Sequence, residues 1–197
     1  LKSFFTNIIF CLFAIASYAH GGDHPIKFQE NKGQWGKELL FFARGASMDV
    51  FVGEGKFMIG LKNTDDMALV HDIHHGLKPS QDEIKLGFHN IEFQLIDPNF
   101  KRAIGQGETE DYVNYFLGND PSKWAGGVKQ FEEVKLPRVY EGVDFILSSL
   151  GDYLKYEFQC ASHSRMDLIQ FKINGADNLE LVENQLLLHN SIDLLTD

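Results

Sequence analysis

Three histidines, His71, His74 and His75, have the spacing in this sequence that is best suited to chemistry. In a helix they would stand at positions i, i+3 and i+4, which places the three imidazoles on one face. Three imidazoles and a water molecule can bind zinc, so these side chains are the candidate metal ligands. A histidine run between polar segments is more often a solvated patch, and no carboxylate partner is evident. We therefore expect no resident metal or other cofactor, and no catalytic residue.

A second arrangement for metal binding depends on His20. If a leader is removed after Ala19, His20 becomes the first residue, and a terminal amine with an imidazole can chelate copper. Chain ends of this kind are often poorly ordered, and no partner histidine is identifiable from the sequence. A copper site at His20 therefore lacks an identifiable further ligand from the protein.

Carboxylates are plentiful, as glycoside hydrolysis would require, but they are not specific. A glycosidase needs two carboxylates at a set separation, and Glu108, Glu110 and Asp111 form one cluster while Glu132 and Glu133 form another. A chain with 28 acidic and 18 basic residues, and a net charge of −10, produces such clusters freely. The acidic balance also argues against a nucleic-acid partner, which needs clustered lysine and arginine. With no Gly-x-Ser-x-Gly, Cys-x-x-Cys or phosphate-loop motif, we expect a protein that is not an enzyme.

Two tryptophans, Trp35 and Trp124, are the candidate platforms for a ligand. Trp35 follows Asn31-Lys32-Gly33, a turn-forming segment whose glycine can adopt a positive φ. Asp120-Pro121 predicts the N-cap and first residue of one helical turn, which we expect to present Trp124 to the core. We expect both rings to be structural and Trp124 to be buried. Exposure of either ring on a flat face would instead favour carbohydrate binding.

The first 19 residues have the features of a secretory signal peptide. Lys2 precedes an apolar run, Phe4–Ala16, and Ser17-Tyr18-Ala19 places small residues where signal peptidase cleaves. The run is too short to span a bilayer stably, so we expect residues 20–197 to be secreted or on the cell surface, without a membrane span. Cleavage would leave Cys160 as the one cysteine, which we expect to be a buried packing residue.

Alternation of apolar and polar residues dominates the rest of the chain. It predicts strands over 57–61, 84–88 and 91–95, and hairpins over 143–158 and 179–188. The three-residue step from Phe88 to Ile91 requires a bulge or turn at His89-Asn90. A short helix is predicted over Asp65–His75. We expect at least eight strands in an all-β fold, an antiparallel β-sandwich with one or two short helices, forming one domain over 20–197.

Several segments in a fixed order resemble a known family. They are Phe28–Trp35, Asn114–Trp124, Tyr140–Asp144, Leu154–Phe158 and Ile173–Asp177. In these segments the chain resembles the uncharacterised N-terminal domain of large secreted Bacteroidota proteins, over about residues 26 to 195. In that family the domain precedes β-propeller-type repeats, PKD or other immunoglobulin-like modules, and often a sorting domain for type IX secretion.

The resemblance implies a context for the chain, and it supplies no catalytic residue. It implies a domain that is truncated at its C-terminal end here, with the downstream extracellular repeat domains of the same protein as its partners. The expected function is a non-catalytic, structural or adhesive module of a larger secreted or cell-surface protein. A carbohydrate-binding module with glycan partners is the first alternative. A secreted metal-dependent hydrolase is the second, if the three histidines meet a carboxylate in a pocket.

Overall fold

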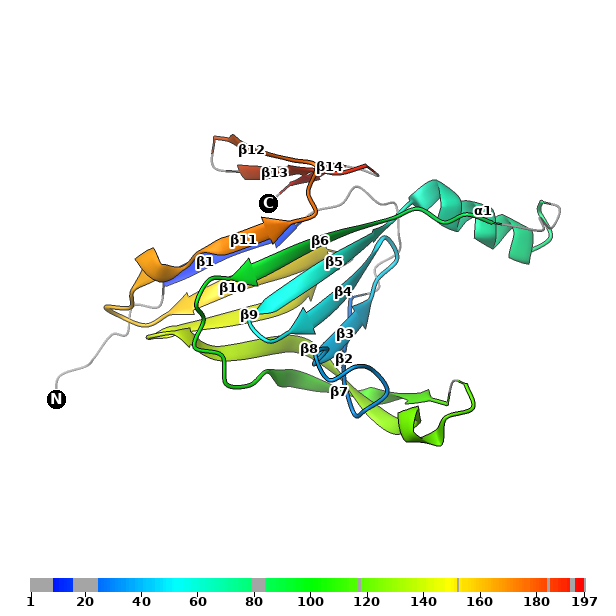
Figure 1. Ribbon diagram of the computed structural model, residues 1–197, viewed down its shortest axis with the longest axis horizontal. Coiled ribbons are helices and arrows are strands. Elements are labelled where there is room, and N and C mark those ends of the chain that lie inside the picture. The colour runs from blue at the N-terminus through cyan, green and yellow to red at the C-terminus, as the bar shows by residue number, and fades with distance from the viewer. Residues whose placement is uncertain are drawn as a thin grey trace.

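The structure is a computed structural model and describes residues 9–15, 25–78, 84–116, 118–151, 153–183, 185–191 and 194–196. Within these residues the chain forms 14 strands, one α-helix and two short 3₁₀ helices (Figure 1). The prediction of an all-β, antiparallel fold with short helices is confirmed. The expected cleavage site, Ser17-Tyr18-Ala19, and His20 lie outside the described residues.

Eleven strands form the main sheet, in the spatial order β1-β10-β9-β8-β2-β3-β4-β5-β6-β11, with β7 paired to β8 as a branch. Their bounds are β1 (Ile9–Ile15), β2 (Phe28–Glu30), β3 (Phe41–Arg44), β4 (Met48–Gly53), β5 (Lys56–Lys62), β6 (Phe88–Leu95), β7 (Ile104–Tyr115), β8 (Ala125–Tyr140), β9 (Val143–Leu150), β10 (Tyr153–Cys160) and β11 (Phe171–Asn174). The 16-residue strand β8 pairs with β2, β7 and β9 along its length. It therefore joins the two halves of the sheet.

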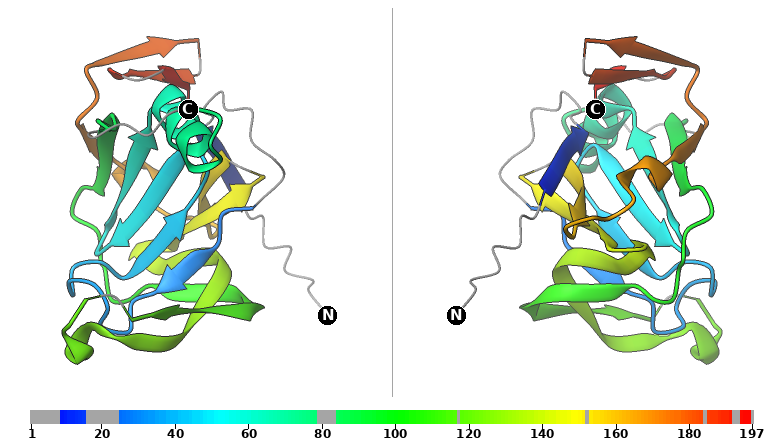
Figure 2. Two further views of the ribbon diagram at one scale, coloured as in Figure 1. Left: turned by 90° about the vertical axis from the view of Figure 1, so that its right-hand side faces the viewer. Right: turned by 90° about the vertical axis from the view of Figure 1, so that its left-hand side faces the viewer.

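The main sheet curls so that β5 and β6 face β9 and β10 across the core (Figures 1 and 2). The ring of Phe57 on β5 lies 5.8 Å from that of Phe145 on β9 and 5.7 Å from that of Tyr156 on β10. Phe171 on β11 contacts the same rings edge to face. Burying one such side chain stabilises the fold by about 1.5–3 kcal/mol. One curled sheet thus supplies both layers of the predicted sandwich.

The predicted strand over 57–61 and both predicted hairpins are present. Phe57, Ile59 and Leu61 are all buried. In the first hairpin Phe145 pairs with Phe158, and in the second Leu181 pairs with Leu186. Cys160, at the end of β10, is buried as predicted.

The predicted strand over 84–88 is wrong, because residues 84–87 are not in a strand and β6 begins at Phe88. β6 pairs residue by residue with β5, without a bulge at His89-Asn90. Ile91 and Phe93 are buried, whereas Phe88 is 55% exposed. Phe88 therefore lies on the outward face, and no slip in register needs to be absorbed.

Helix α1 (Thr64–His74) projects from the sheet after β5, one residue away from its predicted bounds at each end (Figure 1). Asn63 caps it, because its side chain accepts hydrogen bonds from the backbone nitrogens of Asp65 and Asp66. None of its residues is buried. The helix therefore adds no residue to the core, and Oδ2 of Asp66 links it to the segment before β6 by accepting from the backbone nitrogen of Gly87 at 2.7 Å.

A second sheet stands over one end of the first and consists of β12 (Asn178–Val182), β13 (Gln185–His189) and β14 (Leu194–Thr196). Leu188 of β13 is fully buried and belongs to the main core. Its packing therefore attaches the small sheet to the large one.

Residues 9–15, which fall within the expected leader, form the edge strand β1. They pair with β10 from Ile9 opposite Cys160 to Ile15 opposite Leu154. Without β1 the edge of the main sheet would be β10, whose backbone groups on that side would be open to another strand. None of the helices in the described ranges is long and apolar enough to cross a membrane.

Candidate functional site

The loop between β2 and β3 is organised by Asn31. The Nδ2 atom of Asn31 donates to the carbonyl oxygens of Leu39 at 2.6 Å and Gly36 at 2.9 Å, and its Oδ1 accepts from the backbone nitrogen of Gly33 at 2.9 Å. Gly33 has a φ of +108°, as the turn prediction requires. One side chain therefore closes the loop across its base and sets the position of Trp35.

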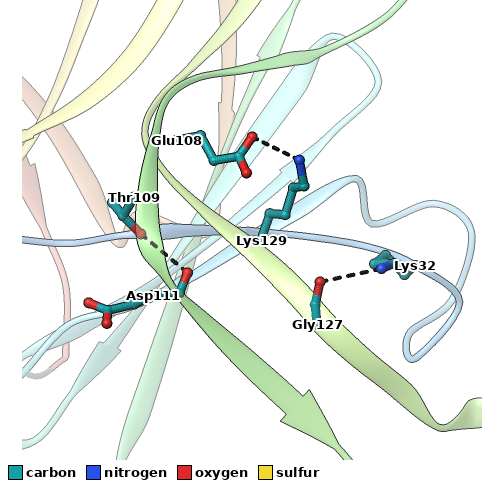
Figure 3. A network of polar contacts seen from close by, with 6 residues as sticks. All are labelled: Lys32, Glu108, Thr109, Asp111, Gly127 and Lys129. Atoms are coloured by element: carbon teal, nitrogen blue, oxygen red, sulfur yellow. Dashed lines mark hydrogen bonds and ion pairs between the residues drawn. The ribbon is translucent and has the colours of Figure 1, made fainter.

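Lys32 ties the same loop to β8. Its Nζ lies 3.2 Å from the carbonyl oxygen of Gly126 and 3.3 Å from that of Gly127 (Figure 3). Because β8 pairs with β7, this contact fixes the loop beside the end of β7, where Tyr115 lies.

The half-buried Trp35 meets two other rings from different strands. Its centroid lies 5.5 Å from that of Phe42 on β3 and 5.2 Å from that of Tyr115 on β7, both edge to face. The Tyr115 hydroxyl donates to Oε1 of the buried Gln29 on β2. Burial raises the pKa of Tyr115, and the nearby charge of Arg44 opposes this rise. At neutral pH Tyr115 is therefore a hydrogen-bond donor with a fixed direction.

Beside these rings lies an open hollow of about 400 Å³, here called the Tyr115 hollow. Its aromatic and basic lining residues are Trp35, Phe42, Phe51, Tyr115, Arg44 and Lys123. Its volume is in the range of ligand sites, about 300–1,000 Å³, which are typically apolar with a few polar groups.

Three charged side chains, Arg44, Asp49 and Lys123, line the Tyr115 hollow. The guanidinium carbon of Arg44 stands 5.6 Å from the centroid of the Phe42 ring, a cation–π arrangement. Asp49 also lines the hollow, but its Oδ1 is 2.7 Å from Nζ of Lys62. The carboxylate of Asp49 is therefore paired with Lys62 and not with Arg44.

Trp35 also lines a second hollow of about 570 Å³, here called the Phe100 hollow. Its charged lining residues are Lys37, Lys101, Arg102, Glu30 and Glu54. Trp35 and Leu39 line both hollows, so the two concave surfaces adjoin at these residues.

Comparison with known proteins identifies the family. Residues 28–197 match the family described as a domain of unknown function, DUF7948. The chain belongs to this family. No curated protein and no solved structure matches the chain. The sequence-based expectation of an uncharacterised family over nearly the same residues is confirmed.

In this DUF7948 domain Trp124 does not reach the core, and the prediction that it is buried is wrong. The predicted cap is present, since Asp120 accepts from the backbone nitrogen of Ser122 and a 3₁₀ turn (Pro121–Lys123) follows. However, Trp124 is 45% exposed. It packs on Phe116, itself 61% exposed, at 6.0 Å. The reason is that β7 and the start of β8 extend beyond the rest of the sheet, so their tip has no core to face (Figure 1).

The three histidines of α1 are near one another but are exposed. The ring centroids of His71 and His75 are 4.3 Å apart, and those of His74 and His75 are 5.5 Å apart. The Nδ1 atom of His71 lies 3.8 Å from Oδ1 of Asp72, but Lys78 also pairs with Asp72 at 3.1 Å. Across the described ranges, no three histidine, cysteine, aspartate or glutamate side chains are placed to hold a metal ion.

The carboxylate clusters are split between ion pairs and solvent. Glu108 pairs with Lys129 at 2.9 Å, and Glu132 pairs with Lys27 at 3.2 Å. Thr109 donates to the carbonyl oxygen of Asp111 at 3.4 Å, where the register of β7 shifts (Figure 3). The Glu108–Lys129 pair joins β7 to β8, and the Asp111 side chain points away from Glu108 (Figure 3).

Sequence reasoning found Trp35 but missed the residues that surround it. The roles of Phe42, Tyr115 and Arg44 follow from strands that are distant in the chain and adjacent in the sheet. A usable signal was present for Tyr115, which lies in the Asn114–Trp124 segment that carries the family resemblance and which contacts Trp35.

Proposed function

We propose that this domain is a non-catalytic, adhesive module of a larger exported protein, and that it adheres by binding carbohydrate at Trp35. The observation that carries the proposal is the Tyr115 hollow, in which four aromatic rings lie beside charged side chains. Sugar rings present apolar C–H faces and polar hydroxyl edges, so they are complementary to a site of this composition.

The export part of the proposal rests on the sequence. Residues 1–19 have the features of a secretory leader, and the family match begins at Phe28, beyond the expected cleavage after Ala19. The resemblance to secreted Bacteroidota proteins supports a place on the cell surface or in the medium, joined to downstream modules. Secretion through the type IX system belongs to the same proposal.

A different observation favours a second role for the tip of the β7–β8 hairpin. Tyr112, Phe116 and Trp124 are exposed by 66%, 61% and 45%. Large exposed apolar groups that lie together are typical of contact surfaces between proteins. The tip is suited to contact the downstream repeat domains of the same protein.

Binding of the chain to polysaccharides tests the leading proposal. Affinity electrophoresis in gels that contain neutral or acidic polysaccharides would measure retardation of the full chain. We expect retardation by at least one polysaccharide, and its loss in Trp35→Ala. The matched control is Tyr153→Ala, which removes an exposed ring at the start of β10, distant from β3 in the sheet. Migration unaffected by every polysaccharide would overturn carbohydrate binding.

A further inference from the structure

We propose that the two hollows beside Trp35 bind an anionic oligosaccharide whose sugar units carry carboxylates. This inference rests on the proposed function and specifies the class of its ligand. The basis of the inference is the group of basic side chains around Trp35, in a chain whose net charge is −10.

More than half of the described basic side chains that form no ion pair lie at the two hollows. Arg44 and Lys123 line the Tyr115 hollow, and Lys37, Lys101 and Arg102 line the Phe100 hollow. Among the residues that the structure describes, none of these five has a carboxylate oxygen within 4.0 Å. Eight other lysine and arginine side chains do form such ion pairs. Of the nine described lysine and arginine side chains without such an ion pair, five line the two hollows; the other four are Lys32, Lys85, Arg138 and Lys172.

The acids at the hollows cancel these cations only in part. Asp49 is already paired with Lys62 at 2.7 Å, which leaves Arg44 and Lys123 of the Tyr115 hollow without an acid in an ion pair. Glu30 and Glu54 line the Phe100 hollow and offset two of its three cations, so one positive charge remains there. A carboxylate in the Tyr115 hollow would therefore gain charge-assisted hydrogen bonds that the protein itself does not supply.

The geometry also favours a chain of sugars over a single acid. Trp35 and Leu39 line both hollows, so a ligand that reaches the cations of both hollows must extend past these residues. The guanidinium of Arg44 can bind a carboxylate with two parallel N–H bonds, while its stacking on Phe42 restricts its orientation. Aromatic rings for the sugar faces and cations for the carboxylates together describe an acidic polysaccharide.

The acidic balance of the whole chain argues against a nucleic acid as the anion. A polyphosphate backbone is attracted by extended basic surface, and this chain as a whole carries a net charge of −10. A short, local set of cations is better matched to a ligand that carries one charge per sugar, spaced by neutral hydroxyl groups. Binding of single-stranded DNA with equal affinity would overturn the proposal.

Calorimetry tests the inference. The full chain is titrated with oligogalacturonate and with oligomannuronate, and the methyl ester of each is titrated for comparison. The methyl ester keeps the sugar and removes the charge. We expect the acids to bind at least tenfold more tightly than their esters and to weaken as salt is raised. Arg44→Gln and Lys123→Gln should each weaken binding of the acid about tenfold, with little effect on the ester. The matched control is Lys172→Gln, which removes an exposed cation from β11, at the far edge of the sheet.

The outcomes separate the inference from the function on which it rests. Equal affinity for acid and ester would overturn the anionic specificity and leave carbohydrate binding intact. No binding of any polysaccharide by the folded chain would overturn both. Because the chain has two tryptophans, Trp124→Phe leaves Trp35 as the one indole, so a change in its fluorescence on titration would place the sugar at the hollows. An unchanged spectrum during calorimetric binding would contradict that location.

Discussion

The indole of Trp35 and the phenol of Tyr115 meet edge to face with centroids 5.2 Å apart, which joins the β2–β3 loop to the end of β7. Asn31 closes the loop that carries Trp35, and Gln29 accepts the hydrogen bond of the Tyr115 hydroxyl. The walls of the Tyr115 hollow are therefore fixed by hydrogen bonds that lie outside it.

Replacement of Asn31 by Ala should destabilise the domain and disturb the Trp35 site. The change removes the bonds to Leu39 and Gly36, and it leaves their carbonyl oxygens to solvent. We expect a loss of about 1–3 kcal/mol in the free energy of unfolding, measured by urea denaturation. Asn99→Ala, at an exposed position, is the control. A loss no larger than that of the control would show that the loop holds its shape without Asn31.

The sequence predicted local structure well and packing partners poorly. Alternation located β5 and both hairpins, and Asp120-Pro121 predicted the turn before Trp124, because these features depend on neighbouring residues. The burial of Trp124 depends on whether the core extends beneath the turn, which local sequence does not encode. The contact of Trp35 with Tyr115 depends likewise on β8 bringing β2 and β7 together.

Replacement of Trp124 by Ala should cost little stability, in keeping with its position at the hairpin tip. A ring that is 45% exposed loses only part of the transfer energy of a buried one. We expect a loss of less than about 1.5 kcal/mol, whereas Phe57→Ala in the core should cost about 3–5 kcal/mol. Both values come from urea denaturation of the same chain. A loss above about 3 kcal/mol for Trp124 would indicate that the ring is buried in solution.

Lowering the pH should reduce the free energy of unfolding of the domain, because Glu92 becomes protonated. Hydrogen bonds from Lys56 at 2.7 Å and Asn174 at 3.2 Å hold the pKa of Glu92 below its ordinary value of 4.5. Because the folded-state pKa is lowered, the stabilisation is present above about pH 4.5 and is lost as the pH falls through the folded-state pKa.

The variant Glu92→Gln tests this linkage, because the amide does not titrate. The difference in unfolding free energy between the native chain and Glu92→Gln should be largest near neutral pH and should shrink on acidification. Denaturant melts over a range of pH measure it. A difference that is constant with pH would refute a contribution from this ionisation.

Removal of residues 1–19 should open the edge of the main sheet. About half of the backbone N–H groups of β10 face β1 in an antiparallel pair, and they lose these partners when residues 9–15 are cleaved. We expect an exported chain that starts at His20, as determined by mass spectrometry of its N-terminus. Its β10 amides should exchange hydrogen faster than those of the uncleaved chain, while β5 stays protected. Retention of Phe4–Phe13 in the exported protein would contradict the cleavage.

The histidines of α1 should bind zinc only weakly. His71 and His75 lie close enough to share an ion, with ring centroids 4.3 Å apart, but the side chain of His71 is 67% exposed and none of the helix is buried. A tight site also needs acceptors that orient each imidazole, and a dry surrounding that strengthens the metal bond. The adjacent carboxylate, Asp72, is already paired with Lys78, whose hydrogen bond lowers the pKa of Asp72.

Metal analysis of the chain purified without a histidine tag, followed by calorimetric titration with zinc, measures this expectation. We expect no zinc to be retained on purification and a dissociation constant well above micromolar, because two exposed imidazoles are readily displaced by water and protons. His163→Ala is a control for non-specific binding, since His163 is exposed and lies in a turn far along the chain from α1. Stoichiometric zinc with sub-micromolar affinity, lost in His71→Ala or His75→Ala but kept in His163→Ala, would overturn the expectation and support a metal-dependent role for the helix.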